Sequence, residues 1–344
     1  MRSLVKFLPS VVVTLLALFA TGCNHKELCY QHPHVGEIRV EFDWRYAPEA
    51  NPQGMVVFFY PLDGESKGQY IRYDFVGGEG GKVNLRAGNY LMLCYNNDSE
   101  IVQSMNITDY YTHSLYTREG NVLEPIYGNG ANYSPRGETD PEKVVICPDK
   151  MYGCTATEVT VDDEGVRYRC EYPDGRSEPI KVPISINQVI TLYPRDLTCN
   201  YTYEIRNVSN LKHVSQMCAS LSGMSGTLTI ADNVLGIEPV TLPFEAHKGD
   251  QTTIVGEFIT FGRNPDFSIP NRMNLYVVMD DGSKYVFGNS SERFDVTQQV
   301  INAPDKRNVH IIIDGLDLPQ PIENGSGFAP DVDDWNDVNV DISF

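Results

Sequence analysis

The segment from Gly22 to His34 contains two cysteines and three histidines, namely Cys23, His25, Cys29, His32 and His34. Thiolates and imidazoles are ligands that zinc and copper prefer in proteins. The spacing follows neither a Cys-x-x-Cys nor a His-x-x-x-His pattern, which weakens the case for a metal. His32 and His34 flank Pro33, and a proline favours an extended chain in which residues two apart share a face. A loose histidine pair stays open, but a polar tether that binds no metal is the favoured interpretation.

The residues before this segment have the layout of a bacterial lipoprotein signal. A basic start with Arg2 and Lys6 is followed by an apolar run that ends at Ala20, which is short for a membrane-spanning helix. Small residues then lead directly to Cys23. We therefore predict a signal peptide over residues 1–22 and a diacylglyceryl group on the Cys23 sulfur. The alternative is an ordinary secretory signal cleaved nearby, which would leave Cys23 as a free or paired thiol.

Lipidation of Cys23 would make it the attachment site to the membrane, because two or three acyl chains suffice for stable anchoring. Residues 23–36 would then form a tether. Without Arg2 and Lys6 the processed chain has 25 basic residues against 46 acidic ones, a formal charge of −21. This charge argues against binding of nucleic acid and against adsorption to anionic lipids. It suits a soluble body held away from a membrane surface.

Short strands separated by glycine, proline, asparagine and aspartate dominate the rest of the chain. In residues 38–44, Ile38, Val40, Phe42 and Trp44 alternate with charged residues, which is typical of a strand with one buried face. Trp44 is therefore expected in a core rather than on a glycan-binding surface. The sequence from 338 to 344 alternates in the same way and is expected to close its own domain, the alternative being that the strand is donated to a neighbouring subunit.

The pattern predicts an all-β protein made of two sandwich-like units. A change of composition at residues 173–183 places the join between them, so that residues 37–184 form an N-terminal sandwich and residues 185–344 a C-terminal one. Residues 211–221 are predicted to be the one short helix. Asp281-Gly282 predicts a hairpin turn, and a second hairpin turn is predicted for the glycine-rich residues 77–83.

The motifs that would indicate catalysis are incomplete. Residues 77–83 are similar to a phosphate-binding loop, but Val83 stands where serine or threonine would hold magnesium. Ser225 lies in a sequence similar to a nucleophile elbow that lacks its second glycine. The aspartates of residues 331–341 surround Asn336 where a calcium loop needs glycine. We therefore predict no enzyme activity, no cofactor and no metal site.

Eight cysteines leave seven if Cys23 carries lipid, so at least one is unpaired or pairs between chains. Export permits disulfides, but the spacing does not define their connectivity. Most of these cysteines are expected to be small buried side chains, with one or two disulfides at most.

Several segments together resemble the fimbrillin-like lipoproteins of Bacteroidales. They are the lipoprotein signal, "CNHKELCYQHPH", "VEFDW", "GMVVFFYP", "AGNYLMLCYNND", "LYPRDLTCNYTYEI", "ASLSGMSG" and the closing "DWNDVNVDISF". The closest group is a domain of unknown function, related in pattern to the anchor and accessory subunits of type V pili. The resemblance covers nearly the whole chain, and Cys23 matches the family's lipid-bearing cysteine.

This resemblance implies two tandem Greek-key, transthyretin-like β-sandwich domains and a structural or adhesion role as a fimbrial anchor or accessory subunit. It implies an outer-membrane lipoprotein at the cell surface, whose partners are other pilus subunits joined by strand addition. The family has no catalytic residues to carry over. The alternative is a surface lipoprotein that binds glycans or nutrients, which would show exposed aromatic residues beside polar loops.

Overall fold

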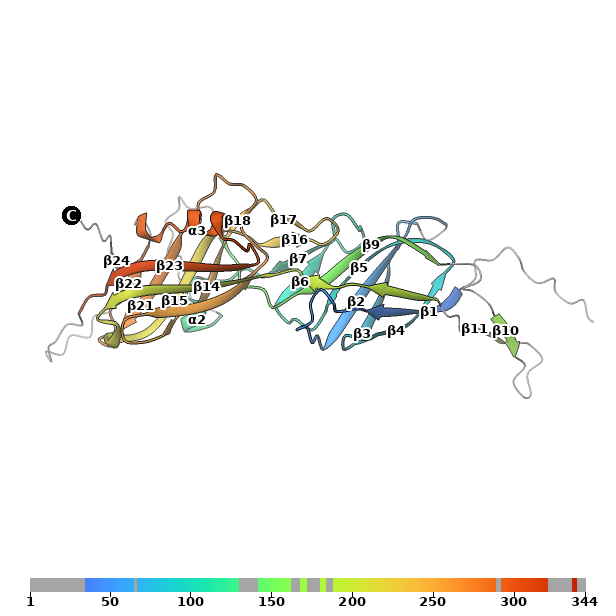
Figure 1. The fold of residues 1–344 in the computed structure, drawn as a ribbon, viewed down its shortest axis with the longest axis horizontal. Coiled ribbons are helices and arrows are strands. Elements are labelled where there is room, and N and C mark those ends of the chain that lie inside the picture. Colours follow the sequence, from blue (N-terminus) through green and yellow to red (C-terminus); the bar gives the residue numbers. More distant parts are fainter. Residues whose placement is uncertain are drawn as a thin grey trace, which may run out of the picture.

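The computed structural model describes residues 35–64, 67–129, 142–161, 168–171, 180–183, 188–288, 292–320 and 336–338. They form an elongated, nearly all-β molecule with two sandwich-like lobes (Figure 1). Strand β1 (Val35–Phe42) begins at one end of the molecule, and β24 (Asn336–Val338) lies at the other. The predicted all-β class is confirmed, and the Greek-key arrangement stays a prediction.

The N-terminal lobe packs a five-stranded sheet against a three-stranded one. The larger sheet has the order β13 (Arg195–Asp196), β9 (Tyr152–Val161), β5 (Gly88–Asn96), β2 (Gly54–Pro61), β3 (Ile71–Val76). The smaller sheet has the order β12 (Val189–Leu192), β1, β4 (Gly80–Arg86). Ile38, Val40 and Phe42 of β1 are buried in the core between the sheets. The buried face predicted for the first strand is therefore confirmed for these three residues.

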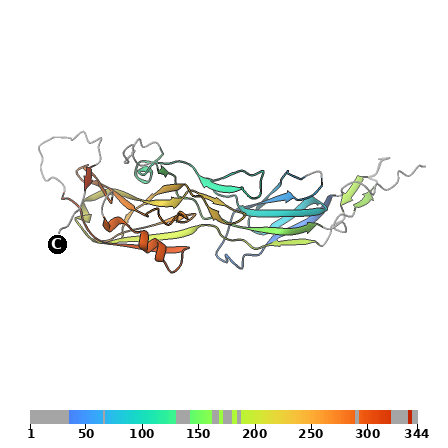
Figure 2. The same ribbon diagram turned by 90° about the horizontal axis from the view of Figure 1, so that it is seen from above.

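The five-stranded sheet is buried on its second face as well, which explains why every residue of β2 is buried. A four-stranded sheet covers that face, in the order β17 (Val234–Leu235), β16 (Thr227–Thr229), β7 (Ser114–Thr117), β6 (Val102–Met105). Phe58 of β2 packs here in one cluster with Leu115 of β7 and Leu228 of β16. Because β7 and β16 come from distant parts of the chain, this sheet joins the two lobes (Figure 2).

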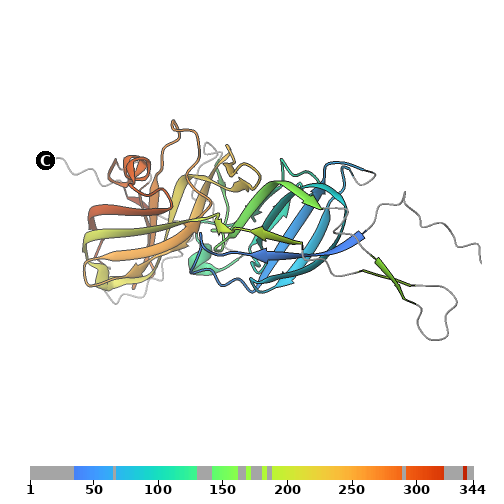
Figure 3. The same ribbon diagram turned by 45° about the vertical axis from the view of Figure 1, so that its right-hand side comes forward.

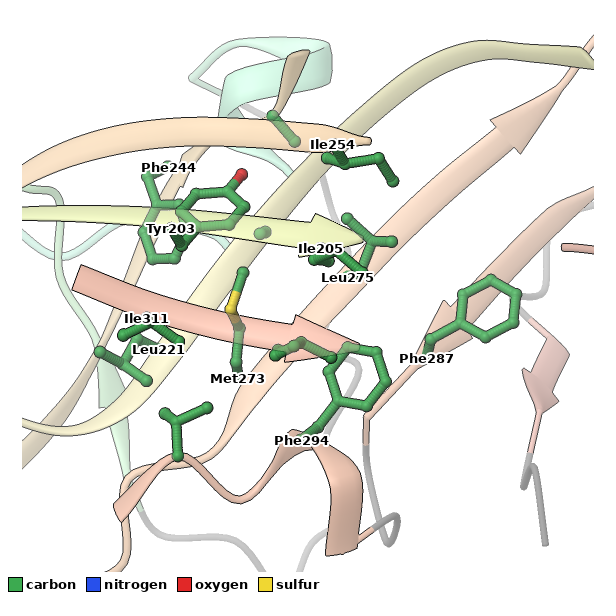
Figure 4. Close-up of a cluster of buried hydrophobic side chains, with 14 of the residues drawn as sticks. Tyr203, Ile205, Leu221, Phe244, Ile254, Met273, Leu275, Phe287, Phe294 and Ile311 are labelled. Carbon is green, nitrogen blue, oxygen red and sulfur yellow. The ribbon is translucent and has the colours of Figure 1, made fainter. Parts of the chain in front are cut away.

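The C-terminal lobe is a sandwich of two sheets. One has the order β19 (His247–Lys248), β20 (Ile254–Thr260), β14 (Cys199–Ser209), β23 (Asn308–Asp317). The other has the order β24, β22 (Lys284–Phe287), β21 (Met273–Met279), β15 (Val214–Ser225), β18 (Pro239–Glu245), β8 (Lys143–Val144). Aromatic and aliphatic side chains of both sheets fill the space between them, including Tyr203, Ile205, Phe244, Met273 and Leu275 (Figure 4).

Shorter elements complete the fold. Strands β10 (Tyr168–Glu171) and β11 (Ile180–Pro183) form a hairpin at the end of the molecule where β1 begins (Figure 3). Helix α2 (Glu124–Tyr127) packs on the outer face of the C-terminal sheet, and a 3-10 turn (Glu292–Phe294) and α3 (Thr297–Asn302) lie beside β23. No helix among the described residues is long and apolar enough to cross a membrane.

Strand pairing crosses the expected boundary between residues 184 and 185 in both directions. Strands β12 and β13 follow that boundary, yet they pair with β1 and β9 of the N-terminal lobe. Strand β8 precedes it, yet it pairs with β18 of the C-terminal lobe. The boundary itself stays a prediction, and the two lobes exchange strands on either side of it.

The helix predicted for residues 211–221 is wrong. Only Leu211–His213 form a 3-10 turn, and β15 begins at Val214. From Cys218 to Ser225 every residue of β15 is buried. The sandwich core covers one face of the strand, and the cluster around Val122 and Leu123 covers Cys218 on the other. Burial on both faces removes the alternation that identifies a strand, so the spacing of apolar residues was misleading.

The hairpin predicted at residues 77–83 is also wrong. Strand β3 belongs to the five-stranded sheet and β4 to the three-stranded one, so the glycine-rich segment is a corner between sheets. Gly80 has a φ of 84°, and a β-carbon there would lie 2.2 Å from the carbonyl oxygen of Val40. Only glycine permits this close approach of two strands. The predicted hairpin at Asp281-Gly282 is confirmed, since it joins the antiparallel strands β21 and β22.

Trp44 lies just beyond the end of β1 and is partly buried. Its Nε1–H donates a hydrogen bond of 2.7 Å to the carbonyl oxygen of Gly78, and its ring packs edge-on against Tyr152 at 5.9 Å. Trp44→Ala is expected to lower the free energy of unfolding by about 3 kcal/mol, as measured by urea denaturation. Trp44→Phe keeps a ring and loses the donor, so it should cost only about 1 kcal/mol. An unchanged melting curve together with lost binding to a glycan panel would instead favour a ligand-binding role for Trp44.

Candidate assembly interface

The residue predicted to carry lipid, Cys23, lies outside the described residues, as do His25, Cys29, His32 and His34. Lipidation therefore stays a prediction. The first described residue, Val35, begins β1 at the end of the molecule remote from the C-terminal lobe (Figure 1). A membrane tether entering at Val35 would leave the C-terminal lobe as the part furthest along the molecule.

A groove of about 850 Å³ runs along the open side of the C-terminal sandwich, where β18 of one sheet faces β20 of the other. We call it the rim groove. Phe244 of β18 and Phe258 of β20 lie in its wall with their rings stacked at a centroid separation of 3.9 Å. Tyr203 of β14 lies beside them and donates a hydrogen bond of 2.9 Å to the carbonyl oxygen of Glu245. The rim groove therefore has an aromatic wall of fixed geometry.

Strand β20 has an exposed edge along the rim groove. Strand β19 pairs only with Ile254 and Val255 at the start of β20. On the outer side, away from β14, the carbonyl of Thr253 accepts a hydrogen bond from the Gly249 N–H. On the inner side, facing β14, the carbonyl of Thr252 accepts one from the Val208 N–H. Because successive residues of a strand point their backbone groups to opposite sides, the N–H and C=O of Glu257 and Ile259 face outward. Within the described part of the chain no strand pairs with them there.

The opposite edge of the same sheet is closed by side chains. The Gln299 amide, from α3, donates to the carbonyl of Ile312 at 2.8 Å and accepts from the Ile312 N–H at 2.8 Å, as a neighbouring strand would. Arg293 donates to the carbonyl of Gly315 on the same strand. Blocking an edge prevents unwanted pairing. The sheet therefore has an unpaired edge at β20 beyond Val255 and a blocked edge at β23.

A second groove, of about 880 Å³, lies on the other side of β8. Ile237, which is 73% exposed, and Pro239 are among its lining residues. The chain from Lys143 to Cys147 separates the two grooves. Lys143 and Val144 form two residue pairs with β18 in the sheet. The Val145 N–H then donates to the carbonyl of Thr241, and the Cys147 thiol donates to the carbonyl of Pro243. The chain itself thus supplies a short strand to the β18 edge, and beyond Val255 the β20 edge across the rim groove has no such cover among the described residues.

Acidic side chains surround the rim groove. Glu204 accepts from His310 at 3.0 Å, and Glu245 lies 3.2 Å from His247. Hydrogen bonds from Arg206 and then His310 hold the pKa of Glu204 below its usual range. Glu257 adds a further carboxylate from β20. A segment with basic side chains would meet complementary charge here.

Exposed aromatic side chains form a separate cluster on the N-terminal lobe. Tyr46 is 65% exposed and Tyr193 is 41% exposed, with ring centroids 6.3 Å apart. The guanidinium of Arg45 lies 5.0 Å from the Tyr193 ring centroid. A pocket of about 500 Å³ beside them includes Arg195 and Arg307.

The other candidate motifs form no site within the part of the chain that the structure describes. Ser225 is 1% exposed, and its hydroxyl oxygen lies 2.9 Å from the carbonyl of Thr227 and 3.0 Å from that of Gly236, which share its one proton. The hydroxyl is therefore engaged with the backbone. Among the described residues no group of three histidine, cysteine, aspartate or glutamate side chains could hold a metal ion. Most of the aspartate-rich segment 331–341 lies outside the described residues.

The two lobes, the rim groove and the contrast between the edges at β20 and β23 define a two-lobed, nearly all-β protein with one unpaired sheet edge. The chain belongs to the family described as a domain of unknown function, DUF5119, whose profile matches residues 22–245. The resemblance stated from the sequence is confirmed at this level.

Two relatives extend the comparison. A Bacteroides ovatus protein, provisionally named fimbrium anchoring subunit Fim4B, is 23% identical over 259 residues, which is 75% of this chain. The match covers 66% of that protein, just under two thirds of its length. The crystal structure of a protein provisionally named an adhesin, also from Bacteroides ovatus, has a TM-score of 0.56 and 18% identity, covering 88% of this chain and 99% of that one. This second similarity shows a shared fold.

Proposed function

We propose that the chain is a lipid-anchored structural protein of the cell surface, acting as an anchoring or accessory subunit of a fimbrium. The observation that carries this proposal is the unpaired outer edge of β20 beside the rim groove, together with the closed edge at β23. The similarity to the protein named as a fimbrium anchoring subunit supports it. The proposed role is structural and requires no catalytic group.

Strand addition is the proposed mode of contact with the neighbouring pilus subunit. An extended segment lying along β20 would pair with the outward N–H and C=O groups of Glu257 and Ile259, and its alternate side chains would enter the rim groove. The aromatic wall formed by Phe244 and Phe258 would bury apolar side chains. Backbone hydrogen bonds would supply affinity, and the groove would select the sequence.

The proposed anchor is Cys23, at the end of the chain that leads to Val35. Lipid on Cys23 would hold the N-terminal lobe near the outer membrane, and the rim groove would lie in the distal lobe (Figure 1). The formal charge of −21 on the processed chain would keep the body away from anionic lipid headgroups. This arrangement joins a membrane at one end of the molecule to a polymer at the other.

Cys23→Ala tests the anchor directly. The variant should move from the membrane fraction to the soluble fraction after a carbonate wash, and fimbriae should be shed into the medium. Cys29→Ala, six residues later in the same tether, is the matched control and should stay in the membrane fraction. If Cys23→Ala remains bound to washed membranes, the proposed anchor is incorrect.

A glycan-binding lipoprotein is the second candidate, and the Tyr46–Tyr193–Arg45 cluster is the observation that favours it. Exposed aromatic rings beside arginines stack on sugar faces and can bind acidic groups. Titration with a panel of neutral and acidic oligosaccharides would detect such binding. Loss of binding in Tyr193→Ala, with fimbriae still attached to the cells, would establish this second role.

A further inference from the structure

Two cysteines lie side by side on adjacent strands of the five-stranded sheet in the N-terminal lobe. Cys94 of β5 and Cys154 of β9 are directly opposite in the antiparallel ladder, and their Sγ atoms are 3.4 Å apart. A disulfide has an S–S length of about 2.05 Å. Small side-chain rotations on strands already held in register would therefore bring the two sulfur atoms together.

Only one of these two cysteines is partly exposed. Cys94 is 0% exposed in the core between the two N-terminal sheets. Cys154 is partly exposed and lines the pocket of about 500 Å³ that contains Thr155, Arg195 and Arg307. A reagent that enters this pocket would meet Cys154 first, and Cys94 lies directly behind it.

The surroundings also separate the two thiols electrostatically. A hydrogen bond with Cys94 lowers the pKa of Cys154, with smaller contributions from the Tyr193 backbone and the Arg195 guanidinium. Burial raises the pKa of Cys94. Burial likewise raises the pKa of Cys147, to about 12, and that of Cys199. Among these cysteines, Cys154 has the surroundings that favour a nucleophilic thiolate.

We propose that Cys154 is a thiol–disulfide exchange site and that Cys94 is its resolving cysteine. The substrate class is a disulfide, either of a small thiol such as glutathione or of an oxidised thiol oxidoreductase. The Cys154 thiolate attacks one sulfur of the disulfide RSSR, forming a Cys154–SR bond and releasing RS⁻. Cys94 then loses its proton and attacks the Cys154 sulfur, so that a second RS⁻ leaves. The two cysteines are oxidised by two electrons and RSSR is reduced to two RSH.

The product would be a cross-strand disulfide between β5 and β9. Cys94 and Cys154 are 60 positions apart in the chain, and the segment between them carries β6, β7, α2 and β8. Within this segment, β7 pairs with β16 and β8 pairs with β18 of the C-terminal half of the chain. The disulfide would link the two ends of this segment, and it would stabilise the fold by restricting the conformations of the unfolded chain.

Exchange with oxidised glutathione tests the proposal on the full-length protein. Protein purified under reducing conditions is incubated with oxidised glutathione, quenched in acid, alkylated and mapped by peptide mass spectrometry. Wild-type protein should gain a Cys94–Cys154 linkage, lose two free thiols and retain no glutathione on Cys154. Its melting temperature should rise after oxidation. This measurement on the wild type does not depend on whether any variant folds.

Three variants separate the two roles. Cys94→Ala should stop at one stable glutathione adduct on Cys154, and Cys154→Ser should leave Cys94 unmodified in the folded chain. Cys199→Ser, which removes a cysteine outside the pair, should behave as the wild type. A wild-type protein in which Cys154 reacts no faster than Cys147 or Cys199, or in which glutathione accumulates on Cys154 without the linkage, would overturn the proposal.

Discussion

Glu257→Pro is expected to weaken capture of a neighbouring fimbrial subunit strongly while leaving the chain folded. The N–H of residue 257 faces outward from β20, so a proline there removes no hydrogen bond from the sheet. A strand added at β20 would no longer find the N–H donor of residue 257, so one of its own buried carbonyls would have no partner. An unsatisfied buried carbonyl costs about 1–3 kcal/mol of binding free energy. Binding should therefore weaken by about tenfold to a hundredfold, measured as the fimbrial protein that co-purifies from detergent-solubilised outer membranes.

Glu257→Ala is the matched control, because it removes the same carboxylate and keeps the N–H. It should retain capture, with at most a small loss from the missing charge. The thermal melting curves of both variants should match that of the parent. Normal capture by a folded Glu257→Pro chain would show that β20 is not the edge used in assembly.

The stability of the protein is expected to fall by about 3 kcal/mol between pH 6.5 and pH 4 because of one histidine. His113 is 0% exposed and lies between the hydroxyls of Tyr60, at 2.7 Å, and Tyr95, at 3.3 Å. Tyr60 donates its own proton to the carbonyl of Ile107, so it accepts from Nδ1–H of a neutral His113. Burial, assisted by the charge of Arg72, lowers the pKa of His113 from 6.5 to about 4.

The loss of stability on acidification follows from the number of protons bound by the folded and unfolded chains. Between pH 6.5 and pH 4 the unfolded chain binds a proton at His113 that the folded chain does not, so acid favours unfolding in this range. Urea denaturation across this range measures the effect. His113→Gln should be less stable at pH 7 and lose this part of the acid dependence, whereas His247→Gln, at an exposed position, should keep the slope of the parent. An unchanged slope in His113→Gln would show that other groups cause it.

Alternation of apolar and polar residues is sufficient to predict the strands that have one solvated face. It identifies β1 through Ile38, Val40 and Phe42. It fails for β15, because Cys218 to Ser225 are buried on both faces by elements distant in the sequence. The prediction for the corner at Gly80 failed for a similar reason. Its role depends on the close approach of the Val40 carbonyl from another strand, and residues 77–83 alone do not indicate it.

The candidate site could be predicted only in part. The signal predicted before Cys23 rests on a local pattern and stays a prediction, whereas the rim groove requires two strands from different sheets. The turn between β19 and β20 sets the outward direction of the Glu257 backbone groups. The hydrogen bond from the Gly249 N–H to the carbonyl of Thr253 in this turn fixes which residues of β20 face the edge. Gln299 is an ordinary polar residue in the sequence. Only its position beside Ile312 shows that it occupies the place of a strand.

The pairing of β1 has a mechanical consequence for a tethered molecule. β1 runs along the long axis with its first residue, Val35, at the end of the molecule (Figure 1). It is paired along its length with β4 and over its second half with β12. A pull on the tether would act parallel to β1 and perpendicular to its hydrogen bonds, so these bonds would be sheared together rather than opened one after another. Under tension the first strand would resist extraction at the point where the load enters the fold.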